Sequence, residues 1–257
     1  MRRLGDIASE AVVLAGAGRA ILLQIAHPAV GYGVARHSDF AARPMSRLNG
    51  TLSYIYALSN GSEEDARLVR RAVNRAHAPV RNPPAAGEAP AEGVPAYDAR
   101  DPQLQLWVAA TLYDTAISVY ERVYGALGPE EGERIYREYA VLGTALQMPP
   151  ELWPADRAAF RDYWNETLAG LHVDATVRGV ADALLRAEAA PWWVRAGMPL
   201  MRQISVALLP ASVRRAFGFA WSARRQRRVD RLFAVLGPVY RMLPRAVRHW
   251  PRRHYLA

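Results

Sequence analysis

His77, in the stretch "AVNRAHAPV", is the residue of this sequence whose type and position most invite chemistry. At about 100° per residue it lies at the edge of the apolar face of a helix, which is formed by Ala66, Val69, Val73, Ala76 and Val80. An imidazole at that edge can reach the interior. Three roles fit it: a hydrogen-bonded core histidine, a cation at the C-terminal end of a helix, and a metal ligand. The cation requires a protonated ring, whereas the metal requires a neutral one. One histidine is too few for zinc, but it is enough for haem iron because the porphyrin supplies four nitrogens.

The other five histidines have plainer contexts. His249 and His254 lie in an arginine-rich tail and are expected to be solvated. His172 follows the end of a predicted helix, where a histidine is common. His37 precedes a polar turn. His27 precedes a proline in an apolar stretch, which favours a core histidine with satisfied hydrogen bonds.

Composition excludes several kinds of site. The 257 residues include no cysteine, which excludes disulfides, thiolate nucleophiles, iron–sulfur clusters and zinc knuckles. All 33 basic residues are arginine, which excludes lysine Schiff bases and P-loop lysines. The metalloprotease pattern H-E-x-x-H, the nucleophile elbow G-x-S-x-G and a Rossmann loop are also missing.

Helices must position His77, because the hydrophobic periodicity is helical nearly everywhere. Ser46 is expected as one N-cap, Ser62 as another, and Gly61 as a left-handed C-cap. The helices are expected at about 6–25, 28–36, 46–59, 62–77, 102–125, 128–147, 155–171, 174–188, 192–209 and 222–242, the last three punctuated by Pro191, Pro210, Pro238 and Pro244. Residues 81–96 read as a loop, either a lid or an entrance. The fold class is therefore all-α, a single domain of about ten helices.

The charge is unevenly distributed. Residues 211–257 contain 12 arginines and one acid, a net +11, whereas residues 1–210 carry −2. We therefore expect a main helical domain over 1–210 and an Arg-rich C-terminal helical extension of the same domain over 211–257. Such a basic segment indicates an anionic partner, either membrane headgroups, nucleic acid or an acidic protein. Residues 221–253 suit an interfacial helix, and no motif supports sequence-specific nucleic-acid binding.

No targeting segment is evident at the start of the chain. Asp6 and Glu10 follow Met1-Arg-Arg, and the apolar run from Ala11 is broken by Gly16, Gly18 and Arg19. No stretch reaches the roughly 20 apolar residues of a membrane span. The expectation is a cytoplasmic protein, soluble or peripheral on the inner face of the membrane.

The order of several segments resembles the bacterial family that includes the latex clearing protein, a rubber oxygenase, and the fungal MpaB oxygenase. The segments are "RAILLQIAHPAVGYGVARHSDF", "SRLNGTLSYIYALSNGSEEDA", "NRAHAPV", "YDARDPQLQLWVAATLYD" and "EYAVLGTALQMPPELWPADRAAFRDYW", with weaker similarity in "LLPASVRRAFGFAW". The resemblance implies a globin-like helical core that holds b-type haem.

The resemblance also assigns residues. The proximal histidine of the rubber oxygenases maps onto His77 in "NRAHAPV". Their distal arginine and threonine map onto Arg47 and Thr51, but Gly50 stands where they have a lysine. No acid occurs between Glu10 and Asp39 to match their distal glutamate. Both departures argue against polyisoprene as the substrate, and neither changes the expectation that the chain binds haem.

The resulting hypothesis is a haem b oxygenase that uses O₂ on an apolar, lipid- or isoprenoid-like substrate. Arg47 would donate a hydrogen bond to O₂ or hold a haem propionate, and Thr51 would orient a water. Trp107 and Thr111, one turn apart, would line the pocket. A salt bridge for Arg47 and a plain core role for Trp107 are the alternatives. Two other functions remain open: a haem-binding sensor or carrier, and a cofactor-free helical module that docks on membranes.

Overall fold

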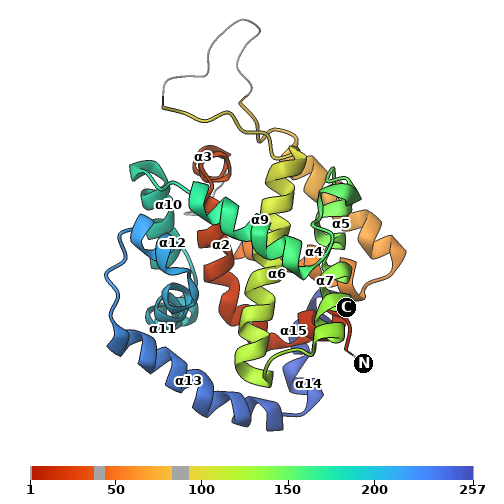
Figure 1. The fold of residues 1–257 in the computed structure, drawn as a ribbon, viewed down its shortest axis with the longest axis vertical. Helices are drawn as coiled ribbons and strands as arrows, with labels where there is room; N and C mark the ends of the chain where they lie inside the picture. The colour runs from red at the N-terminus through yellow and green to blue at the C-terminus, as the bar shows by residue number, and fades with distance from the viewer. Residues whose placement is uncertain (1, 38–43, 83–92, 257) are drawn as a thin grey trace, which may run out of the picture.

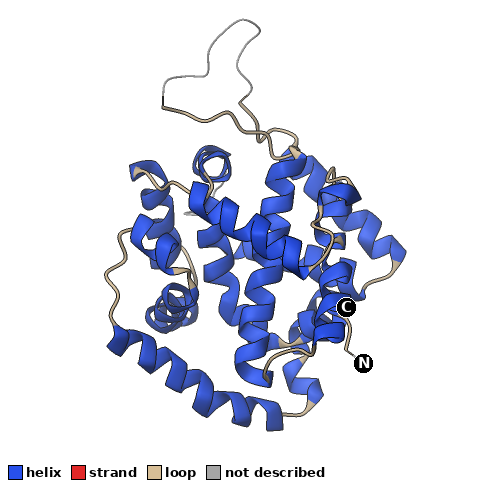
Figure 2. Ribbon diagram, in the orientation of Figure 1, coloured by secondary structure: helices blue, strands red, loops and turns tan. Residues whose placement is uncertain are grey.

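A computed structural model describes residues 2–37, 44–82 and 93–256. Within these ranges the chain is helical with no strand, as Figure 2 shows. The elements are α1 Leu4–Ser9, η1 Ala11–Gly16, α2 Ala17–Ala26, α3 Pro28–His37, α4 Pro44–Asn60, α5 Glu63–His77, α6 Pro102–Tyr124, α7 Pro129–Tyr139, α8 Val141–Thr144, η2 Pro150–Leu152, α9 Arg157–Gly170, α10 Ala175–Arg186, α11 Trp192–Leu208, α12 Ala211–Ala216, α13 Ala223–Met242, α14 Arg245–Arg248 and α15 Trp250–Leu256. The predicted all-α single domain is confirmed.

Helix α6 is the centre of the molecule, as predicted for residues 102–125 (Figure 1). It begins where the side chain of Asp101 accepts the Gln103 N–H at 2.7 Å, with Pro102 in the first turn. It ends at Gly125, whose φ of 87° favours glycine. More than half of its length is buried, because it packs against α2, η1, α13, α7 and α8.

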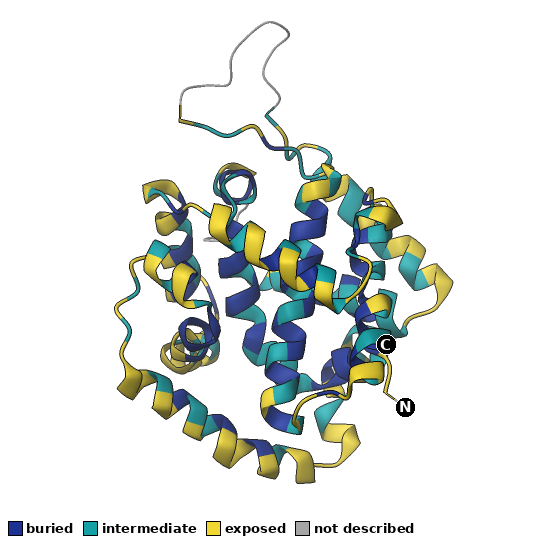
Figure 3. Ribbon diagram, in the orientation of Figure 1, coloured by how far each residue is buried: buried dark blue, intermediate teal, exposed yellow. Residues whose placement is uncertain are grey.

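The core has two parts. The larger surrounds α2, α3, α6, α7 and α9, and the smaller lies between α6, α11 and α13. Tyr113 of α6 makes edge-to-face contacts with Tyr136, Tyr139 and Phe160, with ring centroids 4.9 to 5.2 Å apart. Figure 3 shows that the buried residues lie on the central helices, whereas α13 carries many exposed ones.

Helices α4 and α5 pack against each other as a hairpin. Ser62 caps α5 as predicted: its Oγ accepts the Asp65 N–H at 3.2 Å, and the Asp65 carboxylate accepts the Ser62 N–H at 2.8 Å. The prediction that Gly61 is left-handed is wrong, because its φ is not positive. Glycine is needed there for close approach instead, since a Cβ would lie 2.6 Å from the Ala57 carbonyl oxygen.

Several boundaries differ from those expected. Glu10 adopts an extended conformation and divides the expected 6–25 helix into α1, η1 and α2. Ser46 is not an N-cap, because α4 begins at Pro44. The expected 128–147 helix breaks at Ala140 into α7 and α8. The expected 222–242 helix is confirmed as α13, and its sequence includes Pro238. This proline lies on an exposed face of the helix, where water can satisfy the carbonyl whose hydrogen bond is lost.

The expected loop at 81–96 falls largely on residues 83–92, outside the described ranges. The two described ends of this loop are hydrogen-bonded to each other. Arg81 and Asp98 form an isolated antiparallel bridge, and the Asn82 N–H donates to the Tyr97 carbonyl oxygen at 3.0 Å. The Asn82 side chain in turn accepts the Tyr97 N–H at 2.7 Å.

The C-terminal segment wraps around the main body (Figure 1). Helix α13 packs on α6 and α11, and α15 returns to pack on α4 and α1. The basic extension is therefore packed along the body of the molecule.

Candidate functional site

The α4–α5 hairpin brings Arg47 and His77 together. Arg47 lies in the first turns of α4, and His77 is the last residue of α5. Because both are similar distances along the chain from Gly61, an antiparallel pair places them at the same end. The Arg47 guanidinium is close enough that its charge lowers the pKa of His77.

The imidazole of His77 is neutral at physiological pH. Burial lowers its pKa from 6.5 to about 4, and the charges of Arg47 and Arg100 add to this, while Asp98 opposes it. A cation at the end of α5 is therefore wrong as the role of this ring. Its Nδ1 is buried and has no hydrogen-bond partner among the described residues, so it is not a satisfied core histidine either. Both properties suit a ring that binds a metal or another ligand.

The residues predicted on the distal side lie on α4. The Arg47 residue as a whole is exposed, but desolvation of its guanidinium lowers its pKa. It remains a cation, because the pKa of arginine is so high. The half-buried Thr51 donates its hydroxyl to the Arg47 carbonyl oxygen at 3.2 Å. At Gly50 a Cβ would meet no described atom within 4 Å, so the position could hold a larger side chain.

Trp107 and Thr111 lie in the core of α6, where both are fully buried. The Trp107 indole N–H donates to the Leu23 carbonyl oxygen at 3.2 Å, and its ring stacks on Trp164. The Thr111 hydroxyl accepts from Gln24 at 3.1 Å and donates to the Val108 carbonyl oxygen at 2.7 Å. These partners lie on α2, α6 and α9, so both residues have a full structural role. A role beside a cofactor stays a prediction.

The sequence pattern gives a wrong expectation for the hydrogen bonding of His27. It was expected to be hydrogen-bonded, but its Nδ1 is buried without a partner in the described part of the chain. Burial lowers its pKa, and Asp101 opposes this. Its place at the end of α2 and immediately before Pro28 gave no sign that the ring nitrogen would be left unsatisfied.

A chain of amides fixes the end of α5 to α6. Gln147 donates to Asn74, one turn before His77, at 2.7 Å. Gln105 of α6 donates to Gln147 at 2.6 Å and accepts the Gln147 backbone N–H at 2.8 Å. Gln105 also donates to the Ala99 carbonyl oxygen at 3.1 Å, beside Arg100. A glutamine in the apolar run before Trp107 was the only sequence sign of this network.

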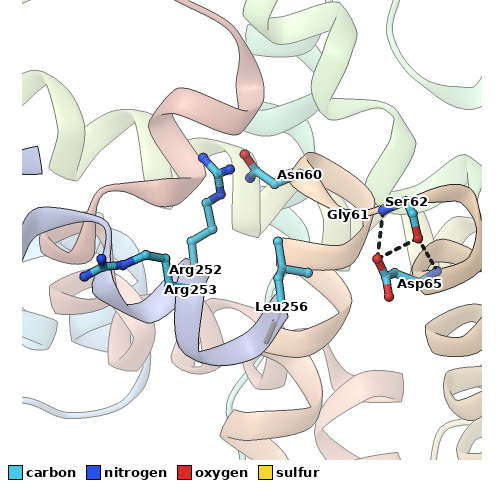
Figure 4. Close-up of a pocket in the computed structure, with 7 residues that line it drawn as sticks. All are labelled: Asn60, Gly61, Ser62, Asp65, Arg252, Arg253 and Leu256. Atoms are coloured by element: carbon cyan, nitrogen blue, oxygen red, sulfur yellow. Dashed lines mark hydrogen bonds between the residues drawn. The ribbon is translucent and has the colours of Figure 1, made fainter. Parts of the chain in front are cut away.

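Two cavities in the described part of the chain lie away from His77. One, of about 350 Å³, lies where α15 meets the start of α5 and is lined by Asn60, Gly61, Ser62, Asp65, Arg252, Arg253 and Leu256 (Figure 4). His77 is at the other end of α5, about 20 Å along its axis. The second lies beside α11 and α13. In the described ranges no three His, Asp or Glu side chains are grouped to hold a metal ion.

None of the helices described is by itself long and apolar enough to cross a membrane. The pair Ala11–Ala26 and Pro28–His37, bent by 105° at its break, meets the criteria of length and composition only when taken together.

Fold and site thus define an all-α protein in which a helical hairpin holds a neutral histidine beside an arginine, with the histidine Nδ1 lacking a partner in the described ranges. Residues 5–238 match the family described as "ER-bound oxygenase mpaB/B'/Rubber oxygenase, catalytic domain". The match covers most of the chain, so the protein belongs to this family and the resemblance seen in the sequence is confirmed.

Two similar proteins come from mycobacteria. An uncharacterised protein of Mycobacterium bovis and one of Mycobacterium tuberculosis are each 35% identical to this chain over 229 residues. The alignment covers 87% of this chain and 87% of each relative. No solved structure matches the chain.

Proposed function

We propose that the protein is a haem b-dependent oxygenase that acts with O₂ on an apolar, lipid- or isoprenoid-like substrate. Its family is one of oxygenase catalytic domains. The observation that carries the haem proposal is the state of His77: its imidazole is neutral and next to a cation, and its buried Nδ1 has no hydrogen-bond partner among the described residues.

The residues present fit this group. Haem needs one protein ligand, because the porphyrin nitrogens occupy four positions on the iron. A histidine binds iron only through a neutral ring, and burial keeps the pKa of His77 at about 4. When bound, haem supplies an iron centre able to activate O₂.

The protein groups have separate tasks. His77 offers a ring nitrogen that is unprotonated at neutral pH. Arg47, held near it by the hairpin, offers guanidinium donors for a propionate or an oxygen atom. The amide chain through Gln147 and Gln105 holds Asn74 and thereby the turn that carries His77. The family description names a rubber oxygenase, and rubber is an apolar isoprenoid polymer, which supports an apolar class of substrate.

The test is the absorption spectrum of protein purified after expression with a haem supply. We expect a Soret band and about one haem per chain. His77→Ala should abolish the band, whereas His172→Ala, an exposed histidine, should keep it. Circular dichroism checks that each variant is folded. A colourless wild-type protein would contradict the proposal and leave a cofactor-free role.

A second variant examines the opposite side of the iron. Gly50→Lys restores the lysine of the rubber oxygenases at a position with open space, and it should also favour the helix by about 1 kcal/mol. If Gly50 faces the iron opposite His77, the variant shows a six-coordinate low-spin spectrum. An unchanged spectrum would place Gly50 elsewhere.

Turnover is measured as O₂ consumption with lipids and isoprenoids. Haem binding without O₂ consumption on any of them would favour the sensor or carrier.

A further inference from the structure

A groove of about 830 Å³ lies between α11 and the start of α13, far along the chain from His77. Among the described residues that line it, none is acidic and five are arginines: Arg186, Arg195, Arg202, Arg225 and Arg228. Like charges gathered around one hollow repel one another, and an anion bound among them would relieve that repulsion.

Three of these arginines are unengaged, meaning that their side chains have no hydrogen-bond or ion-pair partner among the described residues. Arg186 pairs with Glu188 at 3.0 Å, and Arg225 donates to the Ala220 carbonyl oxygen at 2.7 Å. The side chains of Arg195, Arg202 and Arg228 make neither a hydrogen bond nor an ion pair with any residue in the described part of the chain. Their guanidinium groups are free to bind phosphate oxygens through paired donors.

An exposed apolar stripe continues from this groove along α13. Arg225, Arg228, Leu232, Val235, Val239 and Met242 follow one another at alternating spacings of three and four residues, which places them on one face of the helix. Val235, Val239 and Met242 are 66%, 55% and 84% exposed. The buried face of α13, with Val229 and Phe233, points to the core instead. Figure 3 shows the outward side of α13 as exposed along its length.

Tryptophans stand at the start of α11, which forms the other wall. Trp192 and Trp193 are 79% and 60% exposed. Trp192 precedes the groove-lining Arg195 by three residues and Pro199 by seven, so it shares their face of α11. Tryptophan favours the boundary between lipid headgroups and acyl chains.

We propose that this face docks on a lipid bilayer and that the groove binds the phosphate of an anionic phospholipid. The stripe of α13 and Trp192 then enter the headgroup region, as the apolar face of an interfacial helix does. A nucleic acid would leave the apolar stripe in water. A second copy packed symmetrically on this face would bring the two sets of five arginines together. The proposal involves no residue near His77 and does not depend on haem.

The experiment is cosedimentation of the full chain with vesicles. One set contains phosphatidylcholine alone, and the other contains equal parts of phosphatidylcholine and phosphatidylglycerol. We expect binding to the second set, and weak binding to the first. Removing the three unengaged groove charges, as Arg195→Gln, Arg202→Gln and Arg228→Gln together, should weaken binding about a hundredfold.

A matched control removes the same charge from α5, which lies away from α11 and α13 (Figure 1). Arg67→Gln, Arg71→Gln and Arg75→Gln together alter exposed residues that do not line the groove. Their loss should weaken binding less than about tenfold, because charges farther from the lipid are screened. A third variant, Val239→Ser with Met242→Ser, keeps every charge and should weaken binding through the stripe alone.

Equal losses in the two arginine variants would reduce the effect to overall charge and overturn the groove as a site. Failure of the wild-type chain to bind phosphatidylglycerol vesicles would overturn the docking face itself. Undiminished binding by the Val239→Ser and Met242→Ser variant would overturn the insertion of the stripe. Thermal unfolding of each variant confirms that the fold is retained.

Discussion

At the scale of single residues, the protein keeps an imidazole neutral where its sequence position favours a cation. The end of a helix stabilises a protonated histidine, but burial and the nearby charges of Arg47 and Arg100 outweigh this at His77. The orphaned Nδ1 shows that the ring is not held neutral by a hydrogen bond within the described structure. The same side chain therefore costs stability in acid and offers a ligand at neutral pH.

The lowered pKa of His77 makes the folded protein less stable in acid. The folded pKa of about 4 lies below the ordinary value of 6.5, so the unfolded chain binds a proton at His77 before the native chain does. Stability is full above about pH 6.5 and falls as the pH drops toward about 4, by on the order of 2 kcal/mol after allowance for residual solvent exposure. Urea unfolding of the haem-free protein across this window should show the fall.

His77→Gln provides the comparison, because glutamine does not titrate. The variant should lose less stability than the wild type over the same pH interval. Parallel curves for the two proteins would mean that the His77 ring is not desolvated.

At the scale of secondary-structure elements, one buried arginine joins three helices. Arg19 of α2 donates to the Leu208 carbonyl oxygen at the end of α11 at 2.8 Å and to the Thr115 hydroxyl of α6 at 2.6 Å. It also pairs with Asp114. Its side chain is 5% exposed, so its charge is stable there only because all of these partners are present.

We expect Arg19→Met to destabilise the protein by about 3 kcal/mol, because Asp114 and a buried carbonyl lose their partner. Chemical unfolding measures the change. The control is Arg122→Met, which breaks the exposed pair of Arg122 and Asp230 and should cost less than about 1 kcal/mol. Similar losses of stability in the two variants would show that the buried contacts of Arg19 stabilise the protein no more than an exposed ion pair does.

At the scale of the whole molecule, a buried carboxylate fastens the C-terminal helices to the N-terminal ones. Glu10 accepts from the Tyr240 hydroxyl at 2.9 Å and from the His249 ring at 3.1 Å, and it pairs with Arg248. Burial by itself raises its pKa, but hydrogen bonds from Tyr240, His249 and Tyr124 and the charge of Arg248 hold the pKa below its ordinary value. The arginine-rich end of the chain is thus held in place by one of the first acids.

Glu10→Gln should loosen α14 and α15, because Arg248 then lacks its anion. Limited trypsin digestion should cut at Arg245 and Arg248 faster than in the wild type, since proteolysis follows local opening. Glu188→Gln, which breaks an exposed pair with Arg186, should leave these rates unchanged.

Acid should act in the same direction as the Glu10→Gln substitution. The depressed pKa of Glu10 makes its contribution present above about pH 4.5 and lost as the pH falls through its lower folded value. If trypsin cuts the Glu10→Gln variant at neutral pH no faster than the wild type, Glu10 does not hold the C-terminal helices in place.

The sequence by itself determined the features that depend on neighbouring residues. Helix content, the capping box at Ser62, the start of α6 at Asp101 and Pro102 and the buried stripe of α6 all follow from local caps and periodicity. The family followed from the order of short segments. Local reasoning failed where a distant partner intervened, as at Glu10, which leaves the helix to meet Arg248.

Only the tertiary structure decided what His77 and the arginines of the C-terminal half do. The neutrality of His77 comes first from burial of its ring and then from the charges of Arg47 and Arg100, which lie more than twenty residues away on either side. The groove combines side chains from α10, α11 and α13. Desolvation and Coulomb interaction depend on distance in space, and a sequence records only distance along the chain.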